Sequence, residues 1–140
     1  MSLVLLAGWF IFGGLPTAAY ASDLPETDAK ILGYWQRGEG EAIIEVRRQA
    51  DLYNGVIVSS ERRPETVGIE VFRALRYDKE AAAWRGRAYS IKRKREVPID
   101  IEVPHANALE LTAHILIFKK RVQFKRIPDA QVSGLQLAER

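Results

Sequence analysis

The stretch Val97–Phe118, "VPIDIEVPHANALELTAHILIF", decides the fold class. In its first part Ile99, Ile101 and Val103 fall on one face, whereas the acidic residues between them fall on the other, as in a half-buried β-strand. The polar segment "PHANA" then marks a turn, and a second β-rich run follows it. Two such runs joined by turn residues predict an antiparallel hairpin.

Further β-rich runs lie on both sides of this hairpin. "AIIEV" (42–46) and "LYNGVIVSS" (52–60) flank a polar turn, and "WRGRAYSI" and "RVQFKRI" read as additional strands. Gly55 inside the second run suggests a bulge or a close backbone approach. The segment "GIEVFRALRYD" (68–78) fits either a strand or a short helix, because its apolar residues match both periodicities.

The whole pattern comprises about seven to eight short strands with polar turns, and it contains no long amphipathic helix and no repeat. This pattern predicts an all-β domain, either an antiparallel barrel or a sandwich. A single sheet closed on itself would also remove exposed strand edges.

The first 21 residues, "MSLVLLAGWFIFGGLPTAAYA", contain no Asp, Glu, Lys or Arg. An apolar centre is followed by a Gly-Gly-Leu-Pro breaker and by the small residues Ala19 and Ala21, which is typical of a secretory signal peptide cleaved after Ala21. An uncleaved membrane anchor is the alternative, although a span needs about 20 apolar residues.

The composition excludes several kinds of chemistry. The chain of 140 residues has no cysteine, so disulfides, thiol nucleophiles and zinc–thiolate sites are absent. Its length predicts one domain. With 21 basic and 18 acidic residues the net charge is +3, which implies only a mild attraction to anionic surfaces.

No catalytic constellation stands out in the sequence. His105 lies in a turn and His114 in a strand, too far apart in sequence to form a local metal-binding pair. Neither a G-x-S-x-G elbow nor a Gly-rich phosphate loop is present. The carboxylates show no pair with general acid and base roles. We therefore expect no catalytic residue, no metal and no cofactor; an enzyme with a carboxylate-lined barrel mouth is the least favoured hypothesis.

Three aromatic residues, Trp35, Trp84 and Tyr89, are candidate ligand-binding residues, because a small barrel can hold one apolar ligand. They can equally fill the interior as core, and core is the favoured interpretation.

Two basic clusters are the strongest polar feature. We interpret them as candidate contacts to an anionic surface, such as anionic lipid or polysaccharide; they comprise Lys92, Arg93, Lys94 and Arg95 in one cluster and Lys119, Lys120 and Arg121 in the other. The alternative is a solvated hairpin tip whose charges prevent edge pairing. Export argues against nucleic acid as a partner.

The stretch "GYWQRGEGEAIIEVRRQADLYNGVIV" resembles the opening of a family of small exported bacterial proteins, the domain of unknown function family 2147. Gly33 and Trp35 match its G-x-W element, and Trp84 and Tyr89 lie in a segment similar to its W-x-x-G-x-I-Y strand. Arg126 matches the arginine near the end of its closing strands. The resemblance spans residues 31–127. It implies a lipocalin-like barrel in the periplasm or outside the cell, and it implies no activity.

This chain also departs from that family's pattern. Members often carry cysteines around the first hairpin, and this chain has none. Members also have a tight Asp-Pro and Gly-Lys turn after the tyrosine, where this chain has basic residues.

Together these observations predict a signal peptide at 1–21, a flexible leader at 22–30, a β-barrel domain at 31–127 and a C-terminal tail or short helix at 128–140. The leading hypothesis is a non-enzymatic monomer, periplasmic or secreted, that binds a small apolar or amphipathic ligand or an envelope component. The second is a surface-interaction protein that uses its basic face. We expect no nucleic-acid partner and no transmembrane span after cleavage.

Overall fold

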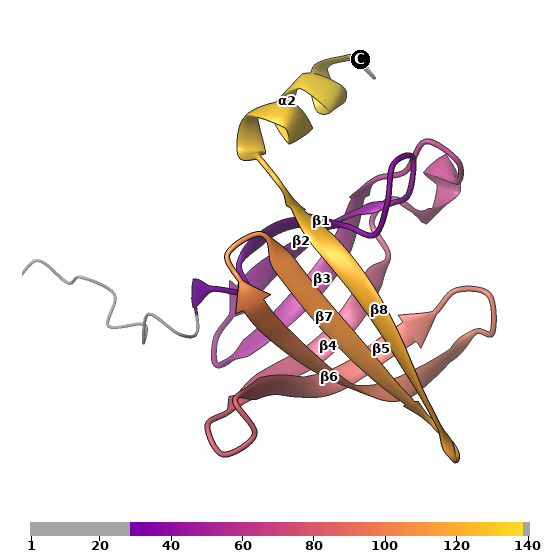
Figure 1. Ribbon diagram of the computed structural model, residues 1–140. Coiled ribbons are helices and arrows are strands. Elements are labelled where there is room, and N and C mark those ends of the chain that lie inside the picture. The colour runs from indigo at the N-terminus through magenta and orange to yellow at the C-terminus, as the bar shows by residue number, and fades with distance from the viewer. Residues whose placement is uncertain (1–28, 139–140) are drawn as a thin grey trace, which may run out of the picture.

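The computed structural model describes residues 29–138, and in it eight strands form a closed barrel followed by one helix (Figure 1). A short 3-10 helix, η1 (Pro64–Thr66), lies between β3 and β4. The strands are β1 (Gly33–Gln36), β2 (Ile43–Gln49), β3 (Leu52–Ser59), β4 (Glu70–Asp78), β5 (Ala83–Ser90), β6 (Arg95–His105), β7 (Ala108–Ile115) and β8 (Phe118–Ile127), and the helix is α2 (Asp129–Ala138).

Each strand pairs antiparallel with the next one in sequence, and β8 returns to pair with β1. The closing ladder is short, since it joins only Tyr34, Trp35 and Gln36 to the last three residues of β8. The predicted all-β antiparallel barrel is therefore confirmed, and the sandwich alternative is wrong. The segment with ambiguous periodicity is strand β4 rather than a helix. The predicted signal peptide and its cleavage site at Ala19 and Ala21 lie outside the described residues.

The alternation of strand directions gives the barrel two different ends. The connections β1–β2, β3–β4, β5–β6 and β7–β8 leave from one end, which we call the loop end. The chain enters the barrel at the opposite end, where α2 also begins after β8, and we call this the closed end (Figure 1). The β7–β8 hairpin extends as an arm beyond the rest of the barrel at the loop end (Figure 1).

Large side chains fill the barrel interior. Ile99 and Ile101 are 1% and 0% exposed, as the alternation in β6 predicts. The same core cluster contains five buried aromatic residues, namely Trp35, Tyr53, Phe72, Trp84 and Phe124. Burial of this apolar surface is the main stabilising contribution available to a chain without disulfides.

A backbone irregularity in β4 brings two strands unusually close. Ala74 has a φ of 52°, and its N–H donates a hydrogen bond to Asn54 Oδ1 at 3.1 Å. The β4–β5 register shifts on either side of Ala74, which identifies a bulge. At Gly86 of β5 an added Cβ would lie 2.7 Å from the Arg73 carbonyl oxygen and 2.9 Å from that of Ala74. The bulge therefore requires glycine at this position. A second register shift occurs at Gly55, as its sequence context predicted.

Arg126 closes the barrel at the closed end. Its Nε donates to the Ala106 carbonyl at 2.6 Å, its Nη1 to Leu32 at 2.6 Å and its Nη2 to Lys30 at 2.7 Å. The guanidinium also lies over the Trp35 ring, 4.2 Å from the centroid, in cation–π geometry. One side chain therefore connects β8, the β6–β7 turn and the chain entering β1.

Gly33 makes room for this arrangement. Its φ of 122° suits glycine, and an added Cβ would lie 2.6 Å from Arg126 Nη1. The Trp35 ring is itself fixed by a hydrogen bond, since its indole N–H donates to the Ile31 carbonyl at 2.9 Å. The G-x-W element thus supplies the space and the ring that Arg126 uses.

We expect Gly86→Ala to lower the free energy of unfolding by about 1–3 kcal/mol, because its Cβ would clash with backbone rather than with a movable side chain. Gly38→Ala is the matched control, since its added Cβ meets nothing closer than Glu41 Cγ at 3.9 Å. Urea denaturation followed by far-UV circular dichroism measures both. Equal stability of the two variants would contradict the proposed close approach.

We expect Arg126→Ala to cost about 3 kcal/mol or more, because three charge-assisted hydrogen bonds and the Trp35 contact are lost together. Arg126→Lys should retain little of this stability, since an ammonium group cannot reproduce the planar fork. Arg121→Ala, on the same strand but exposed, should cost about 0.5 kcal/mol or less. The same denaturation experiment compares the three, and a small loss for Arg126→Ala would refute the closing role.

Candidate functional site

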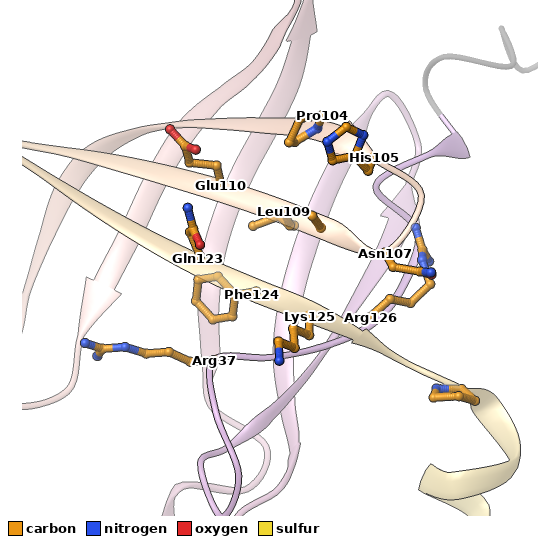
Figure 2. Close-up of a pocket in the computed structure, with 12 residues that line it drawn as sticks. Arg37, Pro104, His105, Asn107, Leu109, Glu110, Gln123, Phe124, Lys125 and Arg126 are labelled. Carbon is orange, nitrogen blue, oxygen red and sulfur yellow. The ribbon is translucent and has the colours of Figure 1, made fainter.

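A groove of about 890 Å³ crosses β7 and β8 near the closed end (Figure 2). The end of β6 borders it on one side, and the residues that follow β1 and β8 border it on the other. Figure 2 shows Glu110 and Gln123 together at one end of the groove and Asn107 beside Arg126 at the other. The lining residues are Arg37, Pro104, His105, Asn107, Ala108, Leu109, Glu110, Gln123, Phe124, Lys125, Arg126 and Pro128.

The groove combines apolar surface with positive charge. Pro104, Ala108 and Pro128 contribute exposed or half-exposed apolar surface, above the buried core residues Leu109 and Phe124. Arg37 and Lys125 are exposed, and neither makes an ion pair with any residue between 29 and 138. The carboxylate of Glu110 lies 3.7 Å from Arg121 Nε, so part of its charge is already compensated.

Arg126 adds a further charge to this groove. Burial lowers the pKa of its guanidinium, and the nearby charge of Asp129 acts in the opposite direction. Its hydrogen-bond acceptors are neutral carbonyl groups, so these three contacts do not neutralise its positive charge. The groove is therefore suited to a ligand with an apolar body and an anionic group.

The structure separates the three aromatic residues that the sequence singled out. Trp35 is fully buried against Arg126, and Trp84 is 2% exposed with its ring 4.8 Å from that of Tyr77. The core interpretation is confirmed for these two. Trp84 Nε1 is buried and has no hydrogen-bond partner among the described residues. None of the three lines the groove, and a ligand-binding role for them stays a prediction.

Tyr89 lies on the outer face of the barrel wall rather than in the interior. It is five residues from Trp84 on the same strand, so the two side chains point to opposite faces. The Arg73 guanidinium lies 4.5 Å from the centre of its ring. Arg73 also donates to Glu96 at 2.9 Å, and this hydrogen bond lowers the pKa of that carboxyl. Tyr89 is thus part of a half-exposed polar surface.

The two basic clusters lie at the loop end. Lys92, Arg93 and Lys94 form the β5–β6 turn, and Arg95 begins β6. The second cluster, Lys119, Lys120 and Arg121, follows the β7–β8 turn. A hollow of about 200 Å³ is lined by both Arg95 and Leu116, so the structure brings the β5–β6 and β7–β8 connections close together. All seven basic side chains are exposed.

His114 and the carboxylates of the outer wall form ordinary polar contacts. His114 Nε2 lies 2.7 Å from Asp100 Oδ2, and Asp100 also pairs with Arg85 on the outer wall. His105 lines the groove without a hydrogen bond or ion pair to any described residue. Within residues 29–138 no group of three or more His, Asp or Glu residues could hold a metal ion. In the same range no helix is long and apolar enough to cross a membrane.

Sequence reasoning missed both the groove and the apolar tip of the β7–β8 hairpin. Arg37 and Lys125 are 88 positions apart, and nothing in their local context separates them from other surface cations. The tip was readable in principle, because "ILIF" (115–118) continues an apolar run through a position where a turn is required.

Comparison with known proteins supports the fold assignment. No protein-family model matches the chain, and no curated protein matches it. The resemblance to the domain of unknown function family 2147 therefore stays a prediction. Among solved structures, the chain is similar to a protein of the human pathogen Helicobacter pylori that is described as belonging to the lipocalin family. The match has a TM-score of 0.59 and 13% identity, and it covers 75% of this chain and 88% of the other. At this identity the comparison shows the fold alone, and that fold is a lipocalin-like barrel.

Proposed function

We propose that the protein is an exported, non-enzymatic, monomeric binding protein of lipocalin-like fold that takes a small amphipathic anion. The observation that carries this proposal is the groove over β7 and β8, where apolar surface meets three cationic side chains, Arg37, Lys125 and Arg126. The proposed location is the periplasm or the extracellular space, and it rests on the N-terminal sequence pattern.

The dimensions of the groove suit a small ligand. Its volume of about 890 Å³ falls within the roughly 300–1,000 Å³ that is common for small-molecule sites. An alkyl or aromatic body covering Pro104, Ala108 and Pro128 would gain about 25 cal/mol for each Å² of apolar surface removed from water. An anionic group at Arg37 or Lys125 would gain a charge partner and would fix the orientation of the ligand.

Binding on the wall rather than in the interior follows from the packing. Trp35, Tyr53, Phe72, Trp84 and Phe124 occupy the core together with aliphatic residues. A ligand in the centre of the barrel would have to displace side chains that are 8% exposed or less. A ligand in the groove displaces none of them.

A second candidate function is contact with anionic lipid or polysaccharide through the basic side chains of the loop end. It is favoured by the exposure of Lys92–Arg95 and Lys119–Arg121 at one end of the barrel. This candidate involves a surface separate from the groove, so both functions can coexist in one molecule.

We expect the double variant Arg37→Gln/Lys125→Gln to bind laurate about three- to tenfold more weakly than the wild type, because two charge partners of the carboxylate are lost. Displacement of 1-anilinonaphthalene-8-sulfonate by laurate measures this affinity. Dodecanol, which has the same chain without a charge, should bind both proteins about equally.

The matched control is Arg48→Gln/Lys79→Gln, which removes the same charge from the end of β2 and from the β4–β5 connection, outside the groove. Its affinity for laurate should equal that of the wild type. If both double variants lose affinity equally, the effect is one of net charge and the groove is not the site. If laurate fails to displace the probe from the wild type, the proposal is wrong.

A further inference from the structure

The tip of the β7–β8 hairpin exposes three large apolar side chains side by side. Leu116 is 93% exposed, Ile117 is 89% exposed and Phe118 is 70% exposed. Val67, in the β3–β4 connection, is the remaining exposed large apolar residue among the side chains described between 29 and 135. Val67, Leu116 and Ile117 belong to connections at the loop end, and Phe118 begins β8 there, so these exposed apolar side chains are concentrated at one end of the barrel.

The backbone conformation of the tip is unusual for a hairpin turn made of bulky residues. Ile115 pairs with Phe118, which leaves a two-residue turn of Leu116 and Ile117. Leu116 has a φ of 54°, in the left-handed region that bulky side chains rarely adopt. Two-residue hairpin turns normally use Gly, Asn or Asp at such positions. Leu116 therefore combines backbone strain with apolar exposure, and Ile117 beside it is also exposed.

Positive charge surrounds the tip. Lys119 and Lys120 follow Phe118 directly, and neither forms an ion pair with a described residue. The β5–β6 turn brings Lys92–Arg95 to the same end, and Arg95 and Leu116 line one hollow. The nearby carboxylate of Glu96 is already bound by Arg73 and Arg87. The apolar tip thus has a basic collar, which we define as Lys92–Arg95 together with Lys119–Arg121.

The basic residues of the collar have a simpler explanation, but that explanation does not account for the exposed apolar residues of the tip. β8 pairs with β1 only from Lys125 onward, so residues 118–124 form an unpaired strand edge. Lysines along such an edge prevent pairing with other chains. Leu116, Ile117 and Phe118 do nothing for this protection, because exposed apolar side chains promote association instead.

We propose that the β7–β8 tip inserts into the interface of an anionic lipid bilayer while the basic collar contacts the lipid headgroups. The apolar side chains would enter the boundary between headgroups and acyl chains, which compensates their exposure in water. The lysines and arginines would be attracted by the negative surface potential, each within a Debye length of the membrane. This inference names the partner of the second candidate function and does not depend on ligand binding in the groove.

The absence of cysteine from the chain allows a direct test. A single Ile117→Cys variant of the full chain, labelled with the environment-sensitive fluorophore NBD, reports on the tip alone. With vesicles of 70% phosphatidylcholine and 30% phosphatidylglycerol we expect a blue shift of the emission and quenching by doxyl groups on the acyl chains. Glu80→Cys, in the β4–β5 connection at the closed end, carries the same label as the control and should show neither effect.

Two further variants separate the apolar and the electrostatic contributions. Leu116→Gly/Ile117→Asn should weaken vesicle binding about tenfold while preserving or improving the turn, because glycine suits the positive φ at position 116. Lys119→Gln/Lys120→Gln should also weaken it and should reduce its salt dependence, because two of the seven collar charges are lost. Co-sedimentation with the same vesicles measures both, and a thermal melt establishes that each variant is folded.

Several outcomes would overturn the proposal. Equal responses of the labels at positions 117 and 80 would show that another part of the chain makes the membrane contact. Equal binding to vesicles of pure phosphatidylcholine would remove the role of the collar. A blue shift at position 117 that rises with protein concentration in the absence of lipid would show that the tip contacts a second copy of the chain. The laurate experiment tests only the groove, and the vesicle experiments test only the hairpin tip. Either proposal can therefore fail without the other.

Discussion

The barrel depends on the contact between the Arg126 guanidinium and the segment that enters β1. Only three residue pairs join β8 to β1, so backbone hydrogen bonds at this seam are few. Arg126 adds three hydrogen bonds to carbonyl groups of two chain segments, and it stacks on Trp35. Closure matters because a barrel without it would expose two strand edges. The chain has no cysteine, so no disulfide can join β8 to the segment that enters β1. The contacts of Arg126 hold these two parts together instead.

The way in which the interior is filled then determines where function can lie. Five aromatic side chains occupy the core, and Gly86 lets β5 approach the bulge at Ala74. Concave surface remains on the wall near the closed end, while exposed apolar side chains remain at the loop end. Both features have positive charge beside apolar surface. They differ in shape, because the groove is recessed and the hairpin tip projects. The recessed groove therefore suits a small ligand, whereas the projecting tip suits a membrane surface.

Much of the fold could be predicted from local pattern. The alternation in β6 correctly placed Ile99 and Ile101 inside, and the β-rich runs correctly indicated an antiparallel barrel. The candidate site could not be predicted in the same way. Arg37 and Lys125 meet in one groove because β1 closes on β8, and no local signal records that pairing. Trp84 and Tyr89, grouped by their closeness in sequence, point to opposite faces of one strand.

The sequence by itself determined the β content, the inward face of β6, the absence of thiol chemistry and the presence of two basic clusters. These properties depend on residue type and short spacing, which the chain displays directly. Only the tertiary structure decided that the core is filled, that Arg126 is the closing residue, and that Leu116, Ile117 and Phe118 project from the barrel beside the basic collar. These properties depend on the register between distant strands, because register alone sets which side chains meet, which are covered and which are left in solvent.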